Sequence, residues 1–211
     1  MQKSLYIPPA HRVEDRNVLH DFMAEFPFVE LVTAAPGIRI THIPVALDRN
    51  AGRYGTLYGH VSSRNPQREA FDGRTGAVAV FRGPHSYISP GWYAAAEAVP
   101  TWNFAAVHAS GTLRAVTGQS ALRDLLARLG FTAEPSPYVD GMMAGIAGFT
   151  MEIERLEGKF KLGQERSEAD RQGILRNLRA APPERSLYQI TEEHYLRIST
   201  PAPARGPVRP E

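Results

Sequence analysis

Five polar and aromatic segments of this 211-residue chain carry the side chains best suited to chemistry. They combine Trp and Tyr with Ser, Thr, Asn, His and Lys, and most are interrupted by proline or glycine. Loops and strand ends of this composition suit an aromatic ring ligand that is held by stacking and by a few directed hydrogen bonds. The alternative is that their aromatic side chains only close the ends of a barrel. The segments are residues 41–44, 59–66, 87–93, 99–104 and 159–166.

Several other chemistries are excluded by what the sequence lacks. The chain has no cysteine, which excludes disulfide scaffolds, thiolate metal sites and cysteine nucleophiles. It also lacks the dinucleotide-binding, Walker, serine-hydrolase and zinc-protease motifs. No pair of histidines has the helical spacing of a metal site, so no metal site is predicted.

The elements that must position these segments are mostly strands. Alternating or β-rich runs predict six strands, the first two of which form a hairpin around an Ala-Pro-Gly turn. Residues 14–26 have apolar side chains at helical spacing and predict a helix before the hairpin. The predicted strands are residues 28–33, 38–45, 55–61, 77–82, 105–116 and 149–156.

Two further helices are predicted after the fifth strand. Residues 120–129 place four leucines on one face, with Ser120 as the cap and Gly130 as the stop, and residues 168–178 form the other helix. Residues 139–146 are weakly patterned. The fold class is therefore α+β and mainly β: an antiparallel six-stranded barrel with peripheral helices, in one domain over residues 1–180. We expect residues 181–211 to form a C-terminal extension with a proline-rich flexible tail.

The charge balance gives no sign of a dedicated nucleic-acid coat. Lys and Arg number 24 against 22 acidic residues, a formal net charge of +2, and the short helices do not form a helix-turn-helix. The first residues contain no apolar stretch, so we expect neither a signal peptide nor a membrane anchor and a cytoplasmic location. Two of the three lysines, Lys159 and Lys161, lie within one tripeptide.

Taken together, the ordered motifs resemble the PaiB family, the FMN-binding negative transcriptional regulators of the FMN-binding split-barrel group. The resemblance covers about residues 5–178. It rests on Thr-His-Ile-Pro at 41–44, Gly-His-Val at 59–61 with Asn-Pro at 65–66, Ser-Pro-x-Trp-Tyr at 89–93, Val-Pro-Thr-Trp-Asn-Phe at 99–104, and Gly-Lys-Phe-Lys-Leu at 158–162.

This resemblance implies FMN in a groove at the interface of a homodimer. FMN needs cations for its phosphate, polar groups for its ring edge and ribityl chain, and aromatic faces for its ring. Strand alternation lets only one of Thr41 and His42 face a groove, and we expect Thr41 to do so. The candidate cofactor-binding residues are Lys159, Lys161, Arg64 and Arg166 for the phosphate, Thr41, Ser89, Thr101 and Asn103 for the ring or ribityl chain, Trp92 and Trp102 beside the ring, and Gln164.

Three functions are compatible with this resemblance. The first is a flavin-binding negative regulator of transcription, which acts through a protein or DNA partner without a recognisable DNA-reading element. The second is an FMN-dependent oxidoreductase of the flavin reductase or pyridoxamine-phosphate oxidase type, with His60 or His108 as a proton donor. The third is haem binding through one of those two histidines.

Overall fold

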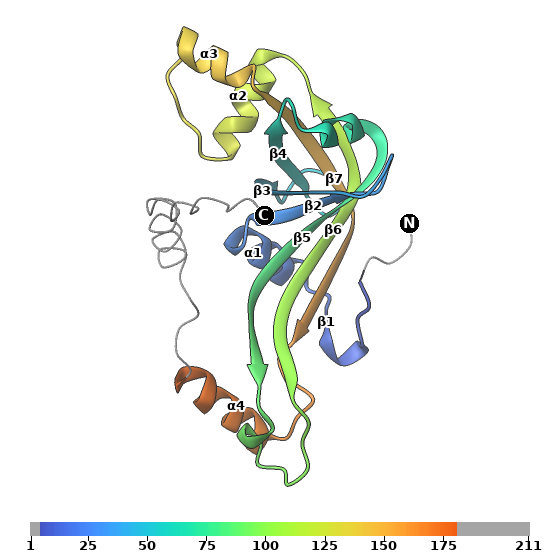
Figure 1. Cartoon of the computed structure of the whole chain (residues 1–211), viewed down its shortest axis with the longest axis vertical. Coiled ribbons are helices and arrows are strands. Elements are labelled where there is room, and N and C mark those ends of the chain that lie inside the picture. The colour runs from blue at the N-terminus through green and yellow to red at the C-terminus, as the bar shows by residue number, and fades with distance from the viewer. Residues whose placement is uncertain (1–4, 181–211) are drawn as a thin grey trace, which may run out of the picture.

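The structure, a computed structural model, describes residues 5–180. Its strands are β1 (Arg12–Val13), β2 (Phe28–Thr33), β3 (Arg39–Asp48), β4 (Thr56–Ser62), β5 (Asp72–Ile88), β6 (Thr101–Val116) and β7 (Ile146–Lys161). Its α-helices are α1 (Arg16–Glu25), α2 (Gln119–Arg128), α3 (Pro137–Met143) and α4 (Glu168–Ala180), and its short 3-10 helices are η1 (Pro9–His11), η2 (Pro66–Ala70) and η3 (Pro90–Trp92). In Figure 1 the long strands β5, β6 and β7 run down from the barrel towards α4, while α2 and α3 lie at the opposite end.

All seven strands belong to one antiparallel sheet in the order β1-β7-β4-β3-β2-β5-β6. Strand β6 also pairs with β7, and this pairing closes β2 to β7 into a barrel. Strand β1 pairs with the last part of β7, where Arg12 lies opposite Lys159. The predicted six-stranded antiparallel barrel is confirmed, with β1 as an additional strand.

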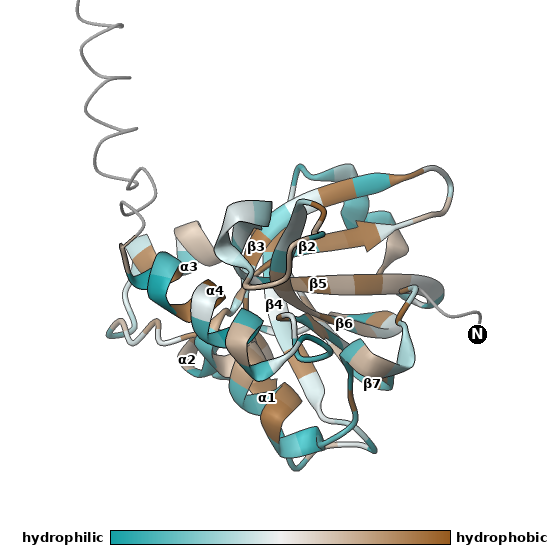
Figure 2. Cartoon of the chain, turned by 90° about the horizontal axis from the view of Figure 1, so that it is seen from below, coloured by the Kyte–Doolittle hydropathy of each residue, from teal (hydrophilic) through white to brown (hydrophobic). Residues whose placement is uncertain are grey.

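Strand alternation builds the core of this barrel. On β2, Val29 and Leu31 are fully buried while their neighbours face outwards. Helix α1 packs its apolar face against the strands and adds Leu19, Phe22 and Met23 to the same core. Hydrophobic and hydrophilic residues are mixed along the strands and along α1 in Figure 2, which is the pattern of elements buried on one side only.

Beyond the barrel, β5, β6 and β7 continue as an arm, which we define as residues 83–104 and 159–180. Strand β2 pairs with β5 only over residues 77–80, so the rest of β5 extends past the barrel together with β6. The end of the arm has its own small core of Ile88, Tyr93 and Ile174, against which Trp92 and Leu178 pack. The arm is therefore a second packed unit connected to the barrel by strands (Figure 1).

Several local expectations differ from the structure. Helix α2 begins at Gln119 with Gly118 in the cap position and no side-chain cap, so Ser120 lies inside the first turn and is not the cap. The weakly patterned residues 139–146 belong largely to α3, whose start is fixed by the Ser136 hydroxyl accepting a hydrogen bond from the Val139 amide. Helix α4 continues to Ala180, and the predicted extension at 181–211 lies outside the described residues.

No helix within residues 5–180 has both the length and the apolarity that are needed to cross a membrane.

Replacement of Gly173 by alanine is expected to loosen the arm. A Cβ at Gly173 would lie 2.0 Å from the carbonyl oxygen of Trp92, so α4 would have to move away from η3. We therefore expect the melting temperature to fall. The intrinsic helix propensity alone would have the opposite effect, because alanine in a helix interior is favoured over glycine by about 1 kcal/mol. Gly141→Ala in α3 is the matched control, because nothing lies within 4 Å of a Cβ there. A Gly173→Ala variant with the same melting temperature as the native chain would contradict this close contact.

Candidate functional site

The arm brings together nine of the eleven residues predicted to bind a cofactor. They come from the end of β5, from η3, from the start of β6, and from the end of β7 with the turn that follows it. These segments are distant in sequence and become neighbours because β6 pairs with both β5 and β7. The nine residues are Ser89, Trp92, Thr101, Trp102, Asn103, Lys159, Lys161, Gln164 and Arg166.

The two arm lysines, Lys159 and Lys161, are positive groups without an acidic partner among residues 5–180. They are two residues apart on β7, so strand alternation places them on the same side of the sheet. The Lys159 Nζ donates to the Tyr6 carbonyl at 3.1 Å, and the Lys161 Nζ donates to the Thr101 hydroxyl. Within the described part of the chain, no carboxylate lies within 4.0 Å of either ammonium group. Their charge is therefore available to an anion.

An exposed aromatic side chain lies on the same arm. Trp102 is 53% exposed, and its ring centroid lies 5.9 Å from that of Tyr87 and 5.9 Å from that of His85. The Lys159 ammonium group lies 5.4 Å from the centroid of Phe104, two residues further along β6. An exposed indole flanked by aromatic rings offers a stacking surface for a flat ring.

The sequence pattern did not predict Tyr87, His85 or Phe104 as individual site residues. Tyr87 pairs with Trp102, and His85 pairs with Phe104, across the β5–β6 ladder. This register follows an irregularity between Arg82 and His85 that the local sequence does not specify. The period-2 spacing of Trp102 and Phe104 is the one signal that could have identified Phe104.

The other arm candidates mainly hold the arm together. Ser89 caps η3 by accepting a hydrogen bond from the Gly91 amide at 3.4 Å, and Trp92 packs in the small core. Asn103 is only 7% exposed. The Gln164 amide donates to the Ala10 carbonyl at 2.9 Å, which fixes the N-terminal segment against the β7–α4 turn.

Glu165 lies close to the two lysines in sequence, but its charge is already paired. Its carboxylate lies 3.3 Å from the His11 Nε2 and 3.9 Å from the Arg166 guanidinium. Burial raises the pKa of Glu165, but its own backbone amide, the His11 hydrogen bond, and the charges of His11 and Arg166 together lower the pKa below its ordinary value. Arg166 in turn stacks over the ring of Tyr93 at 4.8 Å.

Asp170 connects α4 to the segment that follows η3. Its carboxylate accepts hydrogen bonds from the Ala94 amide at 2.8 Å and the Ala95 amide at 3.1 Å, and the residue is buried. Burial raises the pKa of Asp170, but hydrogen bonds from Ala95, Ser167 and Ala94 and the charge of Arg166 outweigh it, so the pKa is lowered overall.

Asp170→Asn is expected to lower the melting temperature at pH 7 and to lose this effect in acid. The folded-state pKa is lower than the unfolded value of about 3.9, so the ionised carboxylate stabilises the fold above that pH and stops doing so as pH falls through the folded-state pKa. The difference in melting temperature between native and variant should therefore narrow from about pH 5 to pH 2. Calorimetry across this range tests it, with the exposed Asp124→Asn as control. A difference that does not change with pH would contradict the assignment.

The remaining two candidates, Thr41 and Arg64, lie away from the arm. Thr41 is half-buried at the start of β3, where its hydroxyl accepts a hydrogen bond from the Asn65 side chain at 3.0 Å, while His42 is exposed on the other side of the strand. Arg64 is exposed in the loop before η2 and has no ion-pair partner among residues 5–180. That loop and η2 lie at the upper part of the barrel in Figure 1, whereas the arm ends at the bottom. A single chain therefore does not bring all eleven candidates together.

The two candidate proton donors also lie on different parts of the barrel. Burial lowers the pKa of His60, which packs edge-on to Phe131 with ring centroids 6.1 Å apart. Burial also lowers the pKa of His108, against the opposing effect of Glu157 and Glu30. For both imidazoles the neutral form is therefore favoured relative to a solvent-exposed histidine. Among the described residues, no three His, Asp or Glu side chains are arranged to hold a metal ion.

Comparison with known proteins identifies the family. Residues 5–155 match the family described as "Putative FMN-binding domain". The sequence is also 30% identical over 186 residues to "Protease synthase and sporulation protein PAI 2" of Bacillus subtilis, an alignment that covers 82% of this chain and 89% of that protein. The chain belongs to the PaiB family of FMN-binding domains. An uncharacterized protein of Emericella nidulans, 28% identical over 81% of this chain and 89% of its own length, is similar to this PaiB-family chain as well.

Solved structures agree with the PaiB assignment at the level of the fold. The flavocytochrome Anf3 from Azotobacter vinelandii superposes with a TM-score of 0.54 at 12% identity, over 100% of this chain and 88% of its own. The FAD and heme binding protein from Mycobacterium smegmatis gives a TM-score of 0.52 at 14% identity, over 95% and 94% of the two chains. At these identities the likeness shows a shared split-barrel fold only.

Proposed function

We propose that this chain binds FMN at the arm, with the phosphate on Lys159 and Lys161 and the ring against Trp102. The observation that carries the proposal is the pair of arm lysines, which have no acidic partner in the described chain and lie on the same arm as an exposed indole. A phosphate dianion needs such charge-assisted donors, and a flat tricyclic ring needs such a face. Membership of an FMN-binding family supports the same ligand.

The residues present fit the chemical parts of FMN. The Thr101 hydroxyl already accepts from Lys161 and would hold this ammonium group in position beside the phosphate. Asn103 follows Trp102 on β6 and is 7% exposed, so strand alternation directs its amide to the other face of the strand, where it would suit the ribityl chain and not the ring on the indole. When bound, FMN would supply electron transfer, while the chain binds and orients it.

We further propose that the complete site forms between two copies of the chain. Thr41 and Arg64 carry a hydroxyl and a cation that has no ion-pair partner among residues 5–180, and both lie away from the arm. A symmetric dimer in which the arm of each protomer packs against the Thr41 and Arg64 region of its partner would complete two equivalent sites. Phe28 and Ile40, which are 62% and 56% exposed on β2 and β3, supply apolar surface for such an interface.

The biological role that we propose is that of a flavin-binding negative regulator of transcription acting through a partner. Its support is the similarity to a Bacillus subtilis protein named for protease synthesis and sporulation. Helices α2 and α3 do not form a helix-turn-helix, since residues 129–136 separate them where that motif has a turn of about three or four residues.

Titration of the purified full chain with FMN tests the proposal. We expect saturable quenching of flavin fluorescence, with one FMN bound per chain, and a dimeric mass by mass photometry on the same sample. Failure to bind FMN at any concentration up to millimolar would overturn the flavin proposal. Steady oxidation of NADH or NADPH by the loaded protein would favour an FMN-dependent oxidoreductase over a regulator.

A further inference from the structure

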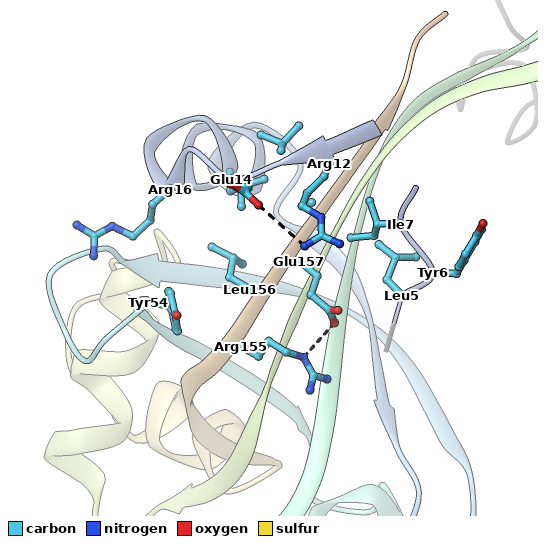
Figure 3. Close-up of a pocket in the computed structure, with 13 residues that line it drawn as sticks. Leu5, Tyr6, Ile7, Arg12, Glu14, Arg16, Tyr54, Arg155, Leu156 and Glu157 are labelled. Atoms are coloured by element: carbon cyan, nitrogen blue, oxygen red, sulfur yellow. Dashed lines mark hydrogen bonds and ion pairs between the residues drawn. The ribbon is translucent and has the colours of Figure 1, made fainter. Parts of the chain in front are cut away.

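A cavity of about 700 Å³ lies between the N-terminal segment and β7, and none of the residues proposed to bind FMN lines it. Figure 3 shows its labelled lining residues, which come from the N-terminal segment, β1, the start of α1, the β3–β4 turn and β7. One part of the lining is apolar and the other is charged. The apolar lining includes Leu5, Ile7, Leu19, Tyr54 and Leu156, and the charged lining consists of Arg12, Glu14, Arg16, Arg155 and Glu157.

The N-terminal wall of this cavity is fixed to the rest of the chain. The Tyr6 carbonyl accepts a hydrogen bond from Lys159, and the Ala10 carbonyl accepts one from Gln164 at 2.9 Å. The cavity ends where β1 and α1 pack against β7 at Gly158, since a Cβ there would lie 2.2 Å from Leu19. The cavity is therefore bounded by hydrogen-bonded and packed elements, as ligand sites in proteins usually are.

The charged side chains that line the cavity give it a net positive charge. Glu157 is 8% exposed and pairs with Arg155 at 3.0 Å, so these two groups balance each other. Arg12 meets the Glu14 carboxylate only at 3.9 Å, and the Glu14 side chain is 80% exposed to solvent. Arg12 also lies opposite Lys159 across the β1–β7 ladder. The lining contains three arginines and two glutamates, and Lys159 lies beside it. This excess of positive charge favours the binding of an anion.

We propose that this cavity binds a small organic anion with an apolar or aromatic body. The anionic head, a carboxylate or sulfonate, pairs with the planar guanidinium of Arg12, which points from β1 towards Glu157 in Figure 3. The body packs against the side chains of Leu19, Leu156 and Tyr54. A volume of about 700 Å³ lies within the range of cavities that hold such molecules.

Binding of 8-anilinonaphthalene-1-sulfonate to the full chain tests this proposal. We expect a saturable fluorescence increase with one dye per chain, displaced by 1-naphthoate and not by the cation 1-naphthylmethylamine. Arg12→Gln should raise the dissociation constant about ten-fold or more, because a charge-assisted pair is lost. Arg49→Gln, which removes an exposed arginine paired with Asp21 elsewhere on the surface, should leave it unchanged.

Other results would overturn the proposal. The proposal is wrong if the dye does not bind or if its binding does not saturate. It is also wrong if the Arg12→Gln variant binds the dye with the same affinity as the native chain. If FMN displaced the dye, the dye would be bound in the flavin site and not in this cavity. FMN affinity should be the same in Arg12→Gln and in the native chain, so failure of this cavity proposal is distinguishable from failure of FMN binding at the arm.

Discussion

Replacing Lys159 and Lys161 together with alanine is expected to weaken FMN binding by about 100-fold or more. Each ammonium group would make a charge-assisted contact with the phosphate, and loss of each such contact costs about 1.5–3 kcal/mol. Neither lysine has an acidic partner within residues 5–180, so the substitutions leave no carboxylate without its counter-ion. Titration by quenching of flavin fluorescence measures the effect, and riboflavin, which lacks the phosphate, should bind both proteins nearly equally.

The control must remove the same net charge elsewhere. Arg49→Gln with Arg74→Gln removes two exposed cations that lie outside the arm, and should change the affinity for FMN less than two-fold or so. Equal affinities in the lysine variant and the control would show that the phosphate binds elsewhere on the chain. The far-UV circular dichroism spectrum and the melting temperature show separately whether a variant has lost its fold.

Mixing two variants that are each impaired in FMN binding is expected to restore FMN binding if the site forms between two copies of the chain. Arg64→Ala impairs one half of the proposed site, and the Lys159→Ala, Lys161→Ala double variant impairs the other. In a mixed dimer one site contains all the substitutions, and the second contains none. With random exchange of protomers, about a quarter of all sites should regain native affinity.

The mixing experiment separates a shared site from a site within one chain. Titration of the mixture after denaturation and joint refolding gives the number of high-affinity sites, and each variant refolded alone gives the baseline. No recovery in a mixture that contains mixed dimers would exclude a site shared between Arg64 of one protomer and the lysines of its partner. The same samples in mass photometry show whether dimers form at all.

The barrel could be predicted from local sequence because each strand alternates apolar and polar side chains. This alternation places Val29 and Leu31 in the core, and the hairpin formed by β2 and β3 follows from it. The arm could not be predicted in the same way. Gly83 and Pro84 have the composition of a turn, yet β5 continues through them because the register shifts there, and proline is tolerated at such irregularities.

The candidate site could be predicted by residue type but not by arrangement. The tripeptide with Lys159 and Lys161 and the segment with Trp102 are visible in the sequence, and the pairing of β6 with β7 brings them together. That pairing and the proximity of Tyr87 to Trp102 depend on long-range register, which local patterns do not encode. The separation of Thr41 from the arm is likewise a property of the tertiary fold.

Strand β7 has a consequence for how the chain folds as it is synthesised. It pairs with β1, β4 and β6, so the barrel cannot close until the ribosome has released residues 146–161. Until then the nascent chain carries β4 and β6 as open edges, which are the surfaces most prone to pair with another chain. Such non-local closure predicts slow folding and a need for protection of the nascent chain until β7 emerges.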